Sequence, residues 1–184
     1  TGQVERLSFN KEFVDDPTPP GGSTTLRFSI RNLDRDRTAT NISFTDDLDA
    51  VVSGMVASSL PGTPCGVSSS VTGSSVLSMT GGTLTAGETC FFDVVVDIPT
   101  SATPGSYNNV TSNITADFSG SSGAGSPATD SLFVEPSPGL SMEFTDDPSG
   151  AGQTVTVQYV ITNTSTTSAA TDISFSSVYD TVLP

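Results

Sequence analysis

Clustered aspartates are the residues of this sequence that are best placed to do chemistry. Several carboxylates held close together repel one another unless a cation lies between them. Calcium suits such a cluster, because it binds about six to eight oxygen ligands. The acidic clusters are Asp15-Asp16, Asp34 with Asp36, Asp46-Asp47 with Asp49, and Asp146-Asp147.

The direction of the strands decides which of these clusters can meet. If the first three strands run up, down and up, the loops after the first and third strands lie at one end of a sandwich, and Asp34 and Asp36 lie at the other. The residues expected at this calcium site are Asp15, Asp16, Asp46, Asp47 and Asp49, with Asp146 and Asp147 in the second copy of the pattern. The alternative is a set of solvated turn residues, because Asp hydrogen-bonds to nearby backbone in turns. No segment matches the EF-hand loop or the glycine-rich calcium nonapeptide, so both interpretations stay open.

Cys65 and Cys90 are the only cysteines of the chain. An even pair in an acidic sequence rich in Ser, Thr and Gly favours a disulfide in an oxidising compartment. Chain-entropy arguments give a bridge that closes a loop of this length a stabilising effect of about 3 to 4 kcal/mol. The alternative is a pair of reduced cysteines in the core.

Catalytic chemistry has little support in the sequence. There is no His, so Ser-His-Asp triads, Cys-His pairs and most zinc sites lack a member. Asp93 and Asp97 are a candidate carboxylate pair for glycoside hydrolysis, but with Phe91 they share the outward face of one expected strand. We expect a protein that is not an enzyme.

Charge and hydropathy restrict the partners further. Six Lys and Arg against 20 Asp and Glu give a net charge of −14, which disfavours nucleic acid and anionic membranes. No apolar run approaches the roughly 18 residues of a membrane span, so we expect no membrane insertion. The sequence opens with neither an initiator Met nor a signal peptide, and we expect that it was excised from a longer protein.

The elements that must position these residues are short strands. Apolar residues alternate with polar ones at Leu7, Phe9 and Phe13, and again in two segments that run from Leu26 to Ile30 and from Ile42 to Phe44. Further strands are expected around 67–71, 76–79, 90–96, 107–114 and 132–134. Gly and Pro clusters separate these runs, and nothing is typical of a helix. The pattern predicts an all-β, antiparallel β-sandwich with Greek-key connections.

An internal repeat divides the chain. The hexapeptide EFVDDP that starts at Glu12 returns as EFTDDP at Glu143, a shift of 131 residues. The same shift carries Phe28 onto Tyr159 and Phe44 onto Phe175, so apolar positions meet apolar positions. We therefore expect a complete repeat at 1–135, a Pro-rich linker at 136–138, and the first three strands of a second, incomplete repeat at 139–184.

A series of short motifs resembles the immunoglobulin-like "conserved repeat domain" of giant bacterial cell-surface proteins. The resemblance covers about residues 6–135 and restarts at 139. The motifs are Phe13, Pro20-Gly21-Gly22, Ile30-x-Asn32, Phe44-x-Asp46-x-Leu48, Pro64-Cys65-Gly66, Gly81-Gly82-Thr83-Leu84-x-Ala86-Gly87-x-x-Cys90 and Pro104-Gly105-x-Tyr107-x-Asn109. The resemblance implies an immunoglobulin-like sandwich, tandem arrays on the bacterial envelope and a Cys65–Cys90 bridge, and it supplies no catalytic residue. The chain is richer in Asp near its loops than that pattern, so a cation role does not follow from the resemblance.

These observations predict a structural and adhesive module of a secreted or cell-surface bacterial protein or filament, which calcium would stiffen if the acidic loops bind it. Residues 139–184 carry an apolar face with no strands to cover it, so either the chain continues beyond Pro184 or strands from another copy of the protein complete the half-repeat. We expect end-to-end or strand-complemented assembly with such copies. The alternative function is an accessory polysaccharide- or protein-binding module of a secreted enzyme. The absence of Trp and the presence of only three Tyr count against it, because carbohydrate platforms use aromatic faces.

Overall fold

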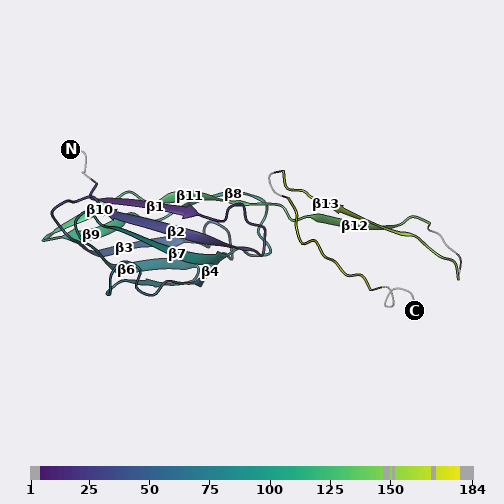
Figure 1. Ribbon diagram of the computed structural model, residues 1–184, viewed down its shortest axis with the longest axis horizontal. Coiled ribbons are helices and arrows are strands. Elements are labelled where there is room, and N and C mark those ends of the chain that lie inside the picture. Colours follow the sequence, from purple (N-terminus) through teal and green to yellow (C-terminus); the bar gives the residue numbers. More distant parts are fainter. Residues whose placement is uncertain (1–4, 147–149, 151, 167–168, 179–184) are drawn as a thin grey trace. The chain divides into compact units, whose positions relative to one another are not determined.

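The computed structural model describes residues 5–146, 150, 152–166 and 169–178. The chain divides into two compact units, residues 1–135 (unit 1) and 136–184 (unit 2). The described residues form strands, turns and loops, as the apolar alternation predicts (Figure 1). They contain no helix that is long and apolar enough to cross a membrane.

Strands follow one another closely along the chain. In order they are β1 (Leu7–Phe13), β2 (Ser23–Asn32), β3 (Ala39–Asp47), β4 (Val56–Ser59), β5 (Ser70–Thr72), β6 (Val76–Leu84), β7 (Thr89–Asp97), β8 (Gly105–Val110), β9 (Ile114–Phe118), β10 (Ser121–Gly125), β11 (Thr129–Val134), β12 (Gly139–Phe144) and β13 (Val157–Thr162). Every pairing between two of these strands is antiparallel.

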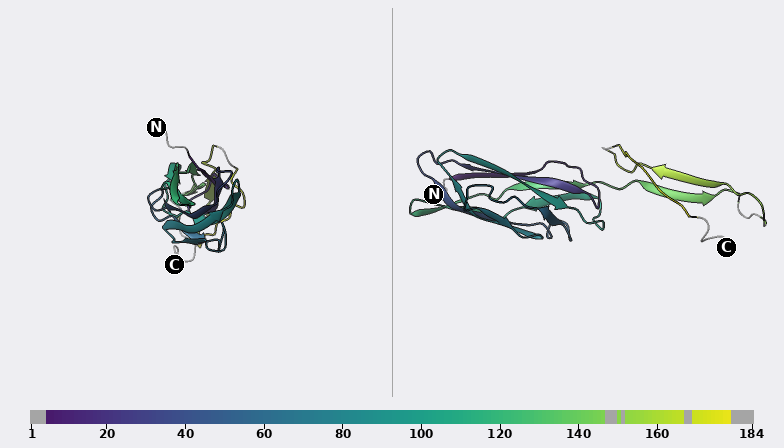
Figure 2. Two further views of the ribbon diagram at one scale, coloured as in Figure 1. Left: turned by 90° about the vertical axis from the view of Figure 1, so that its left-hand side faces the viewer. Right: turned by 60° about the horizontal axis from the view of Figure 1, so that its bottom comes forward.

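Unit 1 is built from three sheets. The first has the strand order β1-β2-β7-β4, the second has the order β10-β9-β3-β6-β5, and β11 pairs with β8 in a third, two-stranded sheet. Figure 2 shows that the long strands of unit 1 run in roughly the same direction or its reverse. Because consecutive strands β2 and β3 belong to different sheets, the chain crosses repeatedly from one layer of the sandwich to the other.

The core lies between the first and second sheets. Phe9 on β1 and Phe28 on β2 face Phe44 on β3, with ring centroids 4.5 and 5.1 Å from that of Phe44. Phe92 on β7 stacks on Phe28 at 5.1 Å. All four rings are buried. Burying a side chain of this size contributes about 1.5 to 3 kcal/mol, so this cluster is a principal source of cohesion between the two layers.

One expected strand divides in two. The segment 107–114 was predicted as continuous, but it forms β8 and β9, which lie in different sheets. The change occurs at Thr111–Asn113, where the Ser112 N–H donates to the Thr45 carbonyl at 2.8 Å and its hydroxyl accepts from the Thr45 N–H at 2.9 Å. These two bonds bring the chain from β8 to the edge of β3, where β9 begins to pair.

Cys65 and Cys90 are joined in a disulfide. Cys90 is the second residue of β7 in the first sheet, and Cys65 lies in the loop between β4 and β5. Both residues are buried. The Cys65 carbonyl also accepts a hydrogen bond from the Thr83 N–H of β6 at 2.8 Å. The bridge therefore ties a loop that leads into the second sheet to a central strand of the first.

Unit 2 contains the hairpin β12–β13. Met142 pairs with Tyr159, which is the pairing of Lys11 with Phe28 moved along the chain by 131 residues. The third strand expected in this unit, around 171–175, is not a strand in the structure. In unit 1 the corresponding strand β3 pairs with β6 and β9, whereas among the described residues of unit 2 no strand pairs with 171–175. Without a neighbouring strand, the backbone of this segment has no partner for the hydrogen bonds of a β-sheet.

Candidate functional site

The aspartates of the loop after β3 act locally. The Asp47 Oδ1 atom accepts a hydrogen bond from the Ala50 N–H at 3.1 Å, and the Asp49 Oδ1 atom accepts one from the Gly54 N–H at 2.7 Å. Both side chains are exposed. They close the turns of residues 48–55, which is the structural role that Asp commonly has in turns.

The remaining predicted aspartates lie in other settings. The Asp16 Oδ1 atom accepts from the Phe133 N–H at 2.7 Å, and partial burial raises the pKa of the Asp16 carboxyl. Asp15 is exposed, and its backbone carbonyl accepts from the Thr18 hydroxyl at 3.0 Å. In unit 2 the Asp146 Oδ2 atom accepts from the Thr156 N–H at 3.0 Å. Asp147 lies outside the described residues.

The expected convergence of these carboxylates is not found. In the part of the chain that the structure describes, no three His, Cys, Asp or Glu side chains are grouped so that they could hold a metal ion. The physical reason begins with Asp46, which continues the inward alternation of Ile42 and Phe44 on β3 and is only 1% exposed. It points into the core instead of toward the loops. Calcium binding by the acidic loops stays a prediction.

Asp46 forms an ion pair with Lys11. The Lys11 Nζ atom lies 3.2 Å from Asp46 Oδ1 and 3.1 Å from Oδ2, and both side chains are 0% exposed. Lys11 occupies the inward face of β1 between Phe9 and Phe13. The pair therefore crosses the interior of unit 1 from the first sheet to the second.

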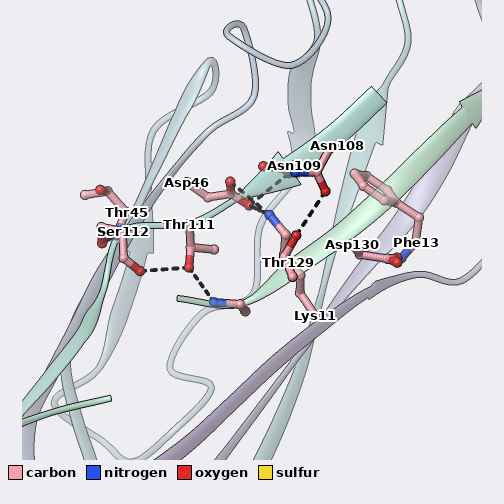
Figure 3. A network of polar contacts seen from close by, with 11 residues as sticks. Lys11, Phe13, Thr45, Asp46, Asn108, Asn109, Thr111, Ser112, Thr129 and Asp130 are labelled. Atoms are coloured by element: carbon pink, nitrogen blue, oxygen red, sulfur yellow. Dashed lines mark hydrogen bonds and ion pairs between the residues drawn. The ribbon is translucent and has the colours of Figure 1, made fainter. Parts of the chain in front are cut away.

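Asn109 completes this group from β8. Its Nδ2 atom donates to Asp46 Oδ2 at 3.3 Å, and the residue is 0% exposed. Its Oδ1 atom is buried and accepts no hydrogen bond from any described residue. Figure 3 shows Lys11 and Asn109 reaching the Asp46 carboxylate from different strands. We call these three residues the buried triad.

Hydrogen bonds around the triad fix the strands that carry it. β8 continues into Thr111, whose hydroxyl accepts from the Ala128 N–H at 3.0 Å, and Asn108 Oδ1 accepts from the Thr129 hydroxyl at 3.0 Å (Figure 3). On β11, the Asp130 Oδ2 atom accepts from the Phe13 N–H of β1 at 2.7 Å. β1, β8 and β11 are thus linked beside the triad, so Lys11 and Asn109 are held in fixed positions.

Burial dominates the electrostatics of the triad. Desolvation lowers the pKa of Lys11 from 10.5 to about 8, although Asp46 and Asp130 both act to raise it. Desolvation also raises the pKa of Asp46 against the opposite effects of Lys11 and Asn109. Both shifts favour the neutral forms, a free amine and a protonated carboxyl. A neutral buried Lys amine is a nucleophile, and a carboxyl beside it is a general acid and base.

Sequence reasoning included Asp46 but missed Lys11 and Asn109. A signal for Lys11 was present, since the alternation Leu7, Phe9, Phe13 skips one inward position, and Lys11 occupies it. Lys11 is also the only lysine of the chain. Asn109 gave a weaker signal, because it stands in the motif Gly105-x-Tyr107-x-Asn109 with a period of two, but that motif does not point to Asp46.

Similar solved structures are all-β modules. A cohesin module from a Clostridium perfringens family 33 glycoside hydrolase has a TM-score of 0.55 and 10% identity, and the match covers 73% of this chain and 100% of that one. The major pilin subunit of Bacillus cereus has a TM-score of 0.51 and 12% identity over 74% of this chain, and a variant of that subunit reaches 0.56 and 12% over 77%. The chain spans less than half the length of the pilin subunit, at 42% and 44%. Identities this low show a shared fold.

Sequence comparison adds the family. A search of the curated proteins finds no significant match. A family model matches residues 8–134, which contain almost all of unit 1 and every residue of the buried triad. Because this match spans more than half of the chain, the protein belongs to the family described as "Domain of unknown function (DUF7933)".

Proposed function

We propose that the protein is a structural and adhesive module of an extracellular bacterial surface protein or filament, and that it assembles with other copies of itself through tandem, immunoglobulin-like repeats. Three findings support this proposal. Unit 1 is an antiparallel sandwich, the similar structures include a pilin subunit and a cohesin module, and the disulfide suits an oxidising compartment.

The apolar face of unit 2 is the observation that carries the proposal. Leu140 and Met142 on β12 are 52% and 50% exposed, whereas Phe9 and Lys11, their equivalents at the 131-residue shift, are 8% and 6% exposed. Leu140 also lines an open groove with Ile161, Ile173 and Phe175. A sandwich interior therefore faces outward in unit 2, and such faces recruit partners.

Unit 2 already has the first layer contact of a sandwich. The Tyr159 and Phe175 rings lie 4.9 Å apart with an interplanar angle of 42°, and the equivalent rings of unit 1, Phe28 and Phe44, lie 5.1 Å apart at 43°. In the described part of unit 2, no strands flank residues 171–175 in the way that β6 and β9 flank β3 in unit 1. We infer that another copy of the protein supplies strands of this kind, which is strand complementation.

Calcium stiffening belongs to the same proposal as a separate step. The loop after β1 and the loop after β3 lie at one end of unit 1, since an ideal Cβ on Gly21 would meet Thr100 and one on Gly54 would meet Pro99. The side chains of Asp16, Asp47 and Asp49 currently bind backbone N–H groups. A bound cation would have to draw them together.

Size-exclusion chromatography with light scattering tests the assembly. The 184-residue chain should form dimers or larger species, and a chain that ends at Glu135 should be monomeric. Ile161→Asp should abolish assembly, because Ile161 lines the groove. Val160→Asp is the matched control, since Val160 is similarly exposed, at 46% against 41%, but points to the opposite face of β13. A monomeric full-length chain whose residues 139–178 resist proteolysis would overturn strand complementation.

A second candidate function is an accessory binding module of a secreted enzyme. The similar cohesin module comes from a glycoside hydrolase, and Phe91 on β7 is 64% exposed beside Arg27. Exposed aromatic faces bind sugars and cations. Co-sedimentation with insoluble polysaccharides tests this function. Binding that is lost in Phe91→Ala would favour the accessory module over the structural one.

A further inference from the structure

The only lysine of the chain is buried in the core of unit 1. A buried ion pair is weak support for stability, because the cost of removing both charges from water can exceed their attraction. Here desolvation does outweigh the attraction, as the lowered pKa of Lys11 shows. Lys11 and Asp46 therefore call for an explanation other than stabilisation by charge.

Unit 2 shows that this fold does not require the pair. At the 131-residue shift, Met142 stands in place of Lys11 and Ser177 in place of Asp46. The pairing of β12 with β13 keeps the register of β1 with β2 even so. Both charged residues are absent from unit 2 together, which indicates that they act as a pair in a role specific to unit 1.

Asn109 gives the Lys11–Asp46 pair a reaction partner. The Lys11 Nζ atom and the Asn109 Nδ2 atom both contact the same oxygen of Asp46, at 3.1 and 3.3 Å. An amine and a carboxamide thus contact the same oxygen of one carboxyl group, which can exchange protons with both. The Asn109 Oδ1 atom accepts no hydrogen bond from a described residue, so no contact of that oxygen has to break when the carboxamide reacts.

We propose that Lys11 and Asn109 join in an intramolecular isopeptide bond between β1 and β8, and that Asp46 transfers the protons for this reaction. The inference is independent of assembly, because all three residues lie within unit 1.

The reaction balances without any co-reactant. The lone pair of the neutral Lys11 amine attacks the Asn109 Cγ atom, and the carbonyl π electrons move to Oδ1. Protonated Asp46 gives its proton to Nδ2 and takes one from Nζ, so its carboxyl group is restored. The carbonyl re-forms as the Cγ–Nδ2 bond breaks and ammonia leaves. One C–N bond forms, one breaks, and nothing is oxidised or reduced.

Two features of the fold favour this chemistry. The side chains of Lys11 and Asp46 are 0% exposed, so water, the competing nucleophile, is excluded. The strands hold the reacting groups together, which makes the attack effectively unimolecular. The shifted pKa values support the same step, because they increase the fraction of free amine and of protonated carboxyl. The product would connect the first strand of unit 1 to β8, which pairs with the last strand, β11.

Intact mass is the first test. After reduction of the disulfide, the folded and purified chain should weigh about 17 Da less than its sequence mass, because one ammonia has left. Asp46→Asn and Asn109→Ala should each show the full mass of their own sequences. Asn108→Ala is the matched control next to the site, and it should still lose about 17 Da. A wild-type chain at its full sequence mass would overturn the proposal.

Amine labelling gives a second readout that needs no variant to fold. In denaturant, the only amines of an unlinked chain are the N-terminus and Lys11. The linked chain should take one label, at the N-terminus. Trypsin should not cut after a Lys11 whose amine is bonded, so the peptide 7–27 should stay joined to the peptide 38–184. Succinimide formation at an asparagine also releases ammonia, but it leaves Lys11 reactive. If wild-type protein that has folded and is then denatured takes two labels, the isopeptide bond is refuted, even if its intact mass is below the sequence mass.

Discussion

Arg27 on β2 and Asp93 on β7 form a bidentate ion pair, with the guanidinium Nε and Nη2 atoms each 2.8 Å from a carboxylate oxygen. The two side chains are 45% and 44% exposed, whereas those of Lys11 and Asp46 are fully buried. The hydrogen bond from Arg27 lowers the pKa of Asp93, and burial raises that of Asp46. The same kind of contact therefore has opposite electrostatic consequences at the surface and in the core.

Single and double substitutions, made and compared in an Asn109→Ala background that cannot form the isopeptide bond, should separate the two ion pairs. Asp46→Ala should lower the free energy of unfolding by about 3 kcal/mol or more, because it leaves Lys11 buried without a partner. Asp93→Ala is the matched control, and it should cost little, since solvent screens an exposed pair. The double variant Lys11→Met with Asp46→Ser, which copies unit 2, should recover most of the loss. Urea denaturation measures all three. Equal losses in Asp46→Ala and in the double variant would contradict this account.

Removing the disulfide should destabilise unit 1. Replacing both cysteines, Cys65→Ala with Cys90→Ala, should lower the free energy of unfolding by about 2 to 5 kcal/mol, because the unfolded chain gains freedom and two buried side chains are trimmed. Chemical denaturation of the variant and the oxidised wild type measures the difference. Alkylation of the untreated protein is the control, and two reactive thiols would show that Cys65 and Cys90 are not bridged.

Period-two alternation was sufficient to predict most of the longer strands of unit 1 and an antiparallel sandwich. Phe28 and Phe44 occupy apolar positions of that alternation, and their rings meet between the sheets at 5.1 Å. The split between β8 and β9 was missed because it depends on Ser112 bonding to Thr45, a contact between segments far apart in the chain. Local patterns carry no information about such a contact.

The site was predicted less well than the fold. Asp46 was grouped with its neighbours Asp47 and Asp49 because all three are acidic and close in sequence. Alternation along β3 makes Asp46 face inward and Asp47 outward, so sequence neighbours have opposite environments. Asn109 could be associated with Asp46 only once β8, which pairs with β11, was placed close to β3, and sequence reasoning did not achieve this.

Calcium stiffening predicts that calcium raises the melting temperature of unit 1. A ligand that binds only the native state stabilises it by about 2.7 kcal/mol at a hundredfold excess over its Kd, which would raise the melting temperature by several degrees. In the structure the carboxylates of Asp47 and Asp49 accept backbone N–H groups and Asp46 is bound to Lys11. A cation would have to free the loop carboxylates from these N–H groups, and with calcium bound we expect the rise of several degrees in millimolar calcium relative to chelator. Melting curves that coincide would contradict calcium stiffening and leave Asp47 and Asp49 as solvated turn residues.

The titration of Lys11 should distinguish linked from unlinked protein. In Asn109→Ala, which cannot form the isopeptide bond, Lys11 keeps its amine, whose pKa is about 8 when folded against 10.5 when unfolded. Between these values the unfolded chain binds more protons, so stability rises with pH. The gain in the free energy of unfolding is about 3 kcal/mol. It is fully present above pH 10.5 and is lost as the pH falls through about 8.

The wild type should show no such rise, because an amide nitrogen does not titrate in this range. Asp46 and Asp130, the carboxylates that act on Lys11, are present in both proteins, so their effects are matched. The raised pKa of Asp46 stabilises the protein at pH values below 3.8, and this contribution is lost as pH rises through its folded value. Free energies of unfolding of both proteins, measured by urea denaturation from pH 7.5 to 10, give the comparison. Parallel curves that both rise would mean that the wild-type Lys11 is a free amine, and two flat curves would mean that burial does not lower its pKa.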